Sequence, residues 1–123
     1  MRYHLGIGSW ADPEYKKLLV APGVPAKERL RAYAAWFDHV ELNLTFYRVP
    51  SAKQAAEWVA QTPEGFTFDF KLHQLFSQSP SRARTDEALI TSTIEGARPL
   101  IEARRLGCFL LVLPPSFKPS KHR

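Results

Sequence analysis

Apolar segments alternate with helix-like patterns along the chain, an order typical of repeated βα units around a parallel sheet. We expect four strands, at residues 3–9, 39–44, 66–72 and 108–113. The last of them is apolar throughout, which predicts a strand that is buried on both faces. The sequence therefore predicts an α/β fold with helices outside a parallel sheet.

The segments between the strands are predicted from periodicity, caps and helix breakers. Helices are expected at residues 26–38, at residues 52–61 and from about residue 85. Pro99 predicts a break at residues 96–98 and a second short helix that Gly107 ends. The proline-rich residues 10–25 and the polar residues 74–84 are expected to be loops.

The second and third strands alternate between polar and apolar residues, so each has a polar face. The polar faces carry His39, Glu41 and Asn43 on one strand and Thr67, Asp69, Lys71 and His73 on the next. If the apolar faces pack on the helices, the polar faces converge on the opposite side, which in a barrel is the interior. Burying Glu41, Asp69 or Lys71 unpaired costs several kcal/mol each, so they must pair or contact water.

Several motifs together resemble one known family. They are Gly6-Ile7-Gly8-Ser9-Trp10, Val40-Glu41-Leu42-Asn43 running into Thr45-Phe46-Tyr47-Arg48-Val49-Pro50, Trp58, Thr62-Pro63-Glu64-Gly65-Phe66 and Leu113-Pro114-Pro115-Ser116-Phe117. The chain is similar in these motifs to the YecE-like family, domain of unknown function 72. The resemblance implies a TIM-barrel-like fold and a bacterial or archaeal origin, and it implies no particular reaction.

The chain also departs from that family's pattern. A full barrel needs roughly 250 residues, whereas this chain has 123. We therefore expect residues 1–123 to form a truncated, N-terminal half of the barrel with about four strands. Val112 stands where the family usually has glutamine, and the family's common Thr-His after the third strand is not evident in residues 74–80. The missing half of the barrel and Val112 both remove polar groups from the expected site.

Three residues are candidates for catalysis, because active sites of such barrels lie at the carboxyl ends of the strands. Glu41 is a candidate general base, or it forms an internal hydrogen-bonded pair with Asn43 that fixes the sheet. Lys71 and His73 bring two donors to one strand face, which suits a phosphate group. The alternative is an ion pair between Lys71 and Glu41, with His73 exposed.

Four further residues are candidates for ligand binding, namely Trp10, Asn43, Tyr47 and Arg48. Aromatic residues after strand ends stack on a sugar or base, or else cap the core. Arg48 binds phosphate or only its own loop. His4, Asp38, His39 and Glu41 lack the spacing of a metal site. We therefore expect neither a metal nor a cofactor.

Charge, cysteine content and apolar runs bear on nucleic-acid binding, on the cellular compartment and on membrane insertion. The formal net charge of +5 invites a nucleic-acid hypothesis, but the basic residues are spread over loops, a helix and the terminus, with clusters only at Arg104-Arg105 and in a tail of Lys118, Lys121 and Arg123. The single Cys108 cannot form an internal disulfide, and its apolar run predicts a buried thiol in a reducing cytoplasm. No stretch of about 20 apolar residues suggests a membrane span.

Three functional hypotheses remain open. The first is an enzyme-type barrel that binds a phosphate-containing or nucleic-acid-derived ligand at the carboxyl ends of its strands. The second is a non-catalytic nucleic-acid-binding module, and the third is an inactive truncated product. In each case we expect the isolated chain to self-associate, because four strands leave two open sheet edges.

Overall fold

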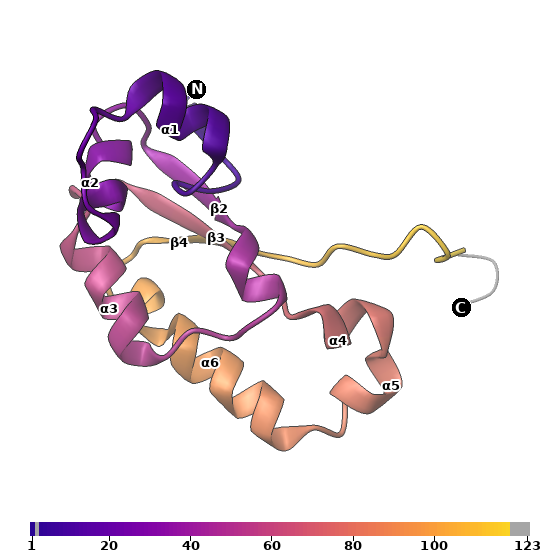
Figure 1. Ribbon diagram of the computed structural model, residues 1–123. Helices are drawn as coiled ribbons and strands as arrows, with labels where there is room; N and C mark the ends of the chain where they lie inside the picture. The colour runs from indigo at the N-terminus through magenta and orange to yellow at the C-terminus, as the bar shows by residue number, and fades with distance from the viewer. Residues whose placement is uncertain (2, 119–123) are drawn as a thin grey trace.

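The computed structural model describes residue 1 and residues 3–118, which form a four-stranded sheet with helices beside it (Figure 1). The strands are β1 (Gly6–Ile7), β2 (His39–Leu42), β3 (Thr67–Lys71) and β4 (Leu106–Leu110). They lie in the order β1-β2-β3-β4, and every neighbouring pair is parallel. The predicted α/β class and the parallel direction of the strands are confirmed.

The core lies on one face of the sheet, where the helices cover it (Figure 1). Val40, Leu42, Phe68 and Phe70 of the strands are at most 1% exposed. They pack with buried residues of α2 (Arg29–Tyr33), α3 (Ala52–Ala60) and α6 (Glu87–Glu102). The alternation predicted for the second and third strands is therefore confirmed, and the polar residues between these apolar ones face away from the core.

Two segments that were expected to be loops contain helices. In the first, α1 (Pro13–Leu19) begins after Asp12, whose Oδ1 accepts a hydrogen bond of 2.9 Å from the Tyr15 amide. In the second lie α4 (Gln74–Gln78) and α5 (Pro80–Ala83). The prediction was wrong because Pro13 and Pro80 occupy the first helical position, where the missing proline N–H has no intrahelical partner to lose.

The other helices also differ from their predicted bounds. The helix expected at residues 26–38 is a 3₁₀ turn, η1 (Ala26–Glu28), followed by the short α2. The expected break near Pro99 is absent, and α6 continues to Glu102. Pro99 loses one hydrogen bond of the helix, but Ala97 and Leu100 on either side of it are fully buried, and their packing holds the helix together.

Strand β4 is two residues earlier and far more exposed than predicted. Gly107 lies within it, and Arg104, with φ of 57°, takes the left-handed position after α6 that was assigned to Gly107. Cys108 is exposed, so the predicted buried thiol and the buried fourth strand are both wrong. The reason is that β4 is the edge strand of this sheet: in the described part of the chain it pairs only with β3, and its three central residues are exposed.

Of the expected basic tail, Lys121 and Arg123 lie outside the described residues. Within residues 1 and 3–118, no helix is both long and apolar enough to cross a lipid bilayer.

Candidate ligand site at the carboxyl ends of the strands

The candidate site lies where β2 and β3 end. Their parallel register places Glu41 beside Asp69 and Leu42 beside Phe70, so the next polar side chains, Asn43 and Lys71, reach the same edge of the sheet. After Leu42 the chain turns into η2 (Asn43–Phe46). The buried Thr45 hydroxyl lies 2.7 Å from the Leu42 carbonyl and 2.6 Å from the Lys71 carbonyl, which ties this turn to the end of β3.

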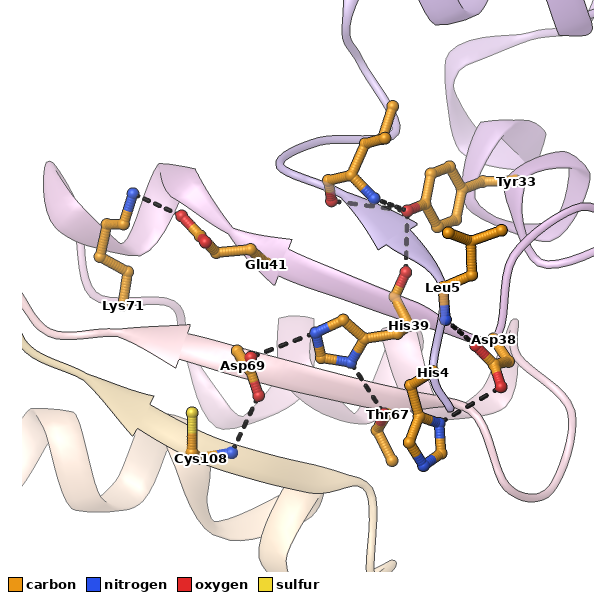
Figure 2. A network of polar contacts seen from close by, with 11 residues as sticks. His4, Leu5, Tyr33, Asp38, His39, Glu41, Thr67, Asp69, Lys71 and Cys108 are labelled. Carbon is orange, nitrogen blue, oxygen red and sulfur yellow. Dashed lines mark hydrogen bonds and ion pairs between the residues drawn. The ribbon is translucent and has the colours of Figure 1, made fainter. Parts of the chain in front are cut away.

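Lys71 is the centre of the polar contacts at this edge. Its Nζ lies 2.6 Å from Glu41 Oε1, the pair drawn in Figure 2, and 2.5 Å from Asn43 Oδ1. The side chain of Lys71 is 16% exposed, against 37% for that of Glu41. An ammonium group has three N–H donors. Within residues 1 and 3–118, two of them are used by these contacts, and the third has no partner.

Asn43 holds the turn after β1 against this ion pair. Its Nδ2 donates a hydrogen bond of 2.7 Å to the Gly8 carbonyl, while its Oδ1 accepts from Lys71. A side chain at Gly8 would collide with the Asn43 amide and displace it from this hydrogen bond. Asn43 thus positions Lys71 and also links β1 to β3 across β2.

The remaining candidates are distributed around this centre. His73 caps α4: its Nδ1 accepts from the Leu75 amide at 3.3 Å, and its Nε2 lies 3.2 Å from the Tyr47 carbonyl. Both ring nitrogens are therefore engaged by the backbone. Trp10 packs edge-on against Trp58 with ring centroids 5.7 Å apart. Arg48 is exposed, and so is Tyr47, a residue with 70% of its surface accessible.

Two cavities adjoin the Glu41–Lys71 pair, one on each side of Asn43. The larger, of about 350 Å³, is lined by Asn43, Phe46, Tyr47, Lys71 and Val112. The smaller, of about 130 Å³, is lined by Glu41 and Asn43 together with residues 8–11 and the neighbouring leucines 42 and 44. The structure thus brings together Glu41, Asn43, Lys71 and Tyr47, with Trp10 in the second cavity. His73 and Arg48 line neither.

A second polar network crosses the same face closer to the amino ends of the strands (Figure 2). His39 Nδ1 lies 2.8 Å from Thr67 Oγ1, and His39 Nε2 lies 3.1 Å from Asp69 Oδ2. The other carboxylate oxygen of Asp69 accepts the Cys108 amide at 3.0 Å. This amide lies at an irregularity where Phe68 pairs with Leu106 but Phe70 pairs with Phe109, so two residues of β4 face Asp69 alone.

This network and its surroundings shift two pKa values. The pKa of the Cys108 thiol is raised, first by desolvation and then by the hydrogen bond and charge of Asp69. The pKa of Asp38 is lowered, chiefly because its carboxylate accepts the Leu5 amide, with His4 at 3.2 Å adding to the effect. His4 thus pairs with Asp38 and His39 with Asp69. Within the described residues no three His, Cys, Asp or Glu side chains are grouped to hold a metal ion.

Our sequence reasoning did not single out the pairing of His39 with Asp69 and Thr67. The signal was available, because all three residues belong to the polar faces of adjacent strands. The sequence did not give the register between the second and third strands. In the structure His39 pairs with Thr67, which leaves Asp69 one step diagonal from the imidazole.

Comparisons with known proteins agree with one another. Residues 4–123 match the family described as "Protein of unknown function DUF72". The UPF0759 protein YunF of Bacillus subtilis (strain 168) is 26% identical over 117 residues, which are 93% of this chain and 40% of that protein. The chain thus spans about two fifths of the length of this relative.

Two solved structures have the same fold. A DUF72 family protein from Enterococcus faecalis V583 is similar with a TM-score of 0.79 and 29% identity, over 97% of this chain and 42% of its own. One from Thermotoga maritima MSB8 is similar with a TM-score of 0.74 and 25% identity, over 94% of this chain and 45% of its own. The four-stranded sheet is thus part of a larger fold in these proteins, and the expected TIM-barrel-like half-fold is confirmed.

Proposed function

The chain belongs to the DUF72 family of proteins of unknown function, and from this premise we propose that its sheet forms part of the ligand site of an enzyme-type barrel. The ligand contains a phosphate group and binds at the carboxyl ends of the strands. Barrels of this kind carry their active sites at that end, on the loops that follow the strands.

The observation that carries the proposal is the position of the Lys71 ammonium group and its contacts. Glu41 and Asn43 fix its ammonium group at the wall of the larger cavity, and one N–H donor is left over. A fixed ammonium is a common ligand of phosphate oxygens. Its low exposure strengthens the attraction, because little water screens the charge. We assign Lys71 to the phosphate and Glu41 to proton transfer as general base.

Tyr47 accounts for a second part of the proposed ligand. The residue is 70% exposed and lines the same cavity as Lys71. Exposed aromatic rings stack on bases and sugars, so a nucleotide-derived ligand fits as well as a simpler phosphate ester. A single cysteine, which has no partner for an intramolecular disulfide, fits a reducing compartment such as the cytoplasm.

The test follows the backbone amides of the isotope-labelled chain by NMR as inorganic phosphate is added against chloride at constant ionic strength. We expect shifts at Lys71, Asn43 and Tyr47. The variant Lys71→Met should lose them, and Lys53→Met, which alters an exposed lysine of α3, should keep them. Shifts that persist in Lys71→Met, or no localised shifts in the unaltered chain, would contradict the proposal.

A non-catalytic nucleic-acid-binding module is the second candidate, because Tyr47 and Arg48 are adjacent and both exposed. Such binding depends steeply on salt, since each neutralised phosphate releases a counterion. Titration of a single-stranded oligonucleotide at several salt concentrations tests it. Arg48→Ala should reduce the salt slope by about one charge. Binding that is independent of salt would speak against this candidate.

A further inference from the structure

We infer that the ligand is the phosphate monoester of a polyol, with its phosphate beside Lys71 and a neighbouring hydroxyl beside Glu41. The inference rests on the proposed function, since it names the ligand class of the same site. Its basis is the arrangement of two cavities on either side of Asn43, one containing the cation and the other the carboxylate.

The carboxylate of Glu41 calls for a hydrogen-bond donor. Its Oε1 is paired with Lys71, and Oε2 has no hydrogen-bond partner within residues 1 and 3–118. The small cavity beside it is lined by Ser9, Trp10 and backbone of the turn after β1, and by no cation. A ligand group that enters there therefore finds a free carboxylate oxygen.

The donor must be neutral. Lys71 Nζ lies 2.6 Å from the Glu41 carboxylate, so an ammonium group bound to Glu41 would come close to a second positive charge at a partly buried site. A hydroxyl group donates the same hydrogen bond without this repulsion. The volume of about 130 Å³ is large enough to admit a hydroxymethyl group of a ligand.

The cation on the other side calls for an acceptor that carries negative charge. The cavity lined by Lys71 has about 350 Å³, and no acidic side chain lines it. Because Nζ and Oε1 are in contact, the acceptor and the donor of one ligand must also lie within a few ångströms of each other. A hydroxyl on the carbon next to the esterified carbon meets this condition.

The experiment compares two probes that differ in one hydroxyl, glycerol 3-phosphate and the monophosphate of propane-1,3-diol. Calorimetric titration of the 123-residue chain should show about tenfold tighter binding of glycerol 3-phosphate, as expected for a hydrogen bond to a charged group. In Glu41→Gln this preference should fall to threefold or less, while inorganic phosphate still binds. Glu64→Gln, at an exposed position outside the site, should keep the full preference.

The outcomes distinguish a failure of the polyol inference from a failure of the proposed function. If inorganic phosphate binds through Lys71 but the two esters bind equally, the polyol inference fails and the proposed function stands. If neither phosphate nor either ester binds, or if Lys71→Met leaves binding intact, both fail. The comparison of the two probes needs only the unaltered chain, so it remains decisive if Glu41→Gln does not fold.

Discussion

Tyr33 shows how a single buried side chain fixes the start of the sheet. Its hydroxyl accepts the Ile7 amide at 2.7 Å and donates to the His39 carbonyl at 2.8 Å, so it joins β1 to β2 from the helix side (Figure 2). The residue is fully buried, and burial raises its pKa to about 12. Tyr15 packs against it edge-on at 5.2 Å, but the Tyr15 hydroxyl is buried without a hydrogen-bond partner in the described residues.

The two tyrosines give a matched pair of variants. Tyr33→Phe should lower the free energy of unfolding by about 1–3 kcal/mol, because it leaves a backbone donor and acceptor unpaired. Tyr15→Phe should leave this free energy unchanged or raise it slightly, since it removes an unsatisfied hydroxyl. Urea denaturation of both variants measures the difference. Equal losses in the two would show that packing, and not the hydrogen bonds, accounts for the effect.

Cys108 provides a prediction about pH. Its thiol pKa lies above the ordinary value of 9.0 because of desolvation and Asp69, so at pH 8 a smaller fraction is thiolate than in an ordinary cysteine. Iodoacetamide should therefore alkylate Cys108 more slowly than free cysteine, although the residue is exposed. Asp69→Asn removes the negative charge and should speed the reaction severalfold, whereas Glu64→Gln should not. A rate equal to that of free cysteine would contradict the assignment.

At the scale of residues, the sequence predicted which side chains form a pair better than it predicted how buried each side chain is. The Glu41–Lys71 ion pair was one of two readings of alternating strand faces, because the alternation places both residues on one side. The exposure of Cys108 could not be read from its apolar run, since burial depends on what covers β4 and not on β4 itself. The engagement of His73 with the backbone required the helix α4, which the polar composition of residues 74–84 did not indicate.

At the scale of elements, α6 packs closely against the turn before α3. Gly96 is buried in the middle of α6, and a side chain at this position would collide with the Pro50 carbonyl. Gly96 lies in the segment where Pro99 predicted a break, but it is needed there for contact between the helix and this turn. Likewise, Pro13 and Pro80 begin helices and do not interrupt them. The same residue types serve turns, caps and close packing, and only the tertiary structure distinguishes these uses.

Substitution of Gly96 tests this packing. Alanine normally favours a helix by about 1 kcal/mol over glycine. Gly96→Ala should nevertheless lower the free energy of unfolding, by about 1–3 kcal/mol as in other overpacked sites. Ser92→Ala, at an exposed position of the same helix, should change it little. Thermal denaturation followed by circular dichroism measures both. A stabilised Gly96→Ala variant would refute the close contact.

For the whole molecule, the main feature is that β4 lies at an edge of the sheet and, in the described residues, has no strand paired on its outer side. Phe109, Leu111, Val112 and Leu113 are 41–47% exposed on and after this strand, and the segment runs away from the helices (Figure 1). In its relatives, the matched region is less than half of the protein. An apolar strand edge without a neighbour pairs readily with other chains.

We therefore predict that the 123-residue chain self-associates at micromolar concentration. The double variant Leu111→Lys and Leu113→Lys should shift sedimentation velocity profiles towards monomer, because charges on an edge oppose pairing. Leu18→Lys, which alters a still more exposed leucine of α1, should not. A monomeric, cooperatively unfolding chain would show instead that the half-barrel is stable by itself.

The position of Asn43 has a consequence for how the two sides of the site interact. Lys71 cannot move towards a ligand without changing the partners of Asn43, and the Asn43 side chain cannot turn without releasing the Gly8 carbonyl. A group in the larger cavity that displaces Lys71 therefore also disturbs the turn that forms the smaller one. Because such coupling is reciprocal, a molecule in either cavity changes the affinity of the other by the same factor, even when two separate molecules occupy them.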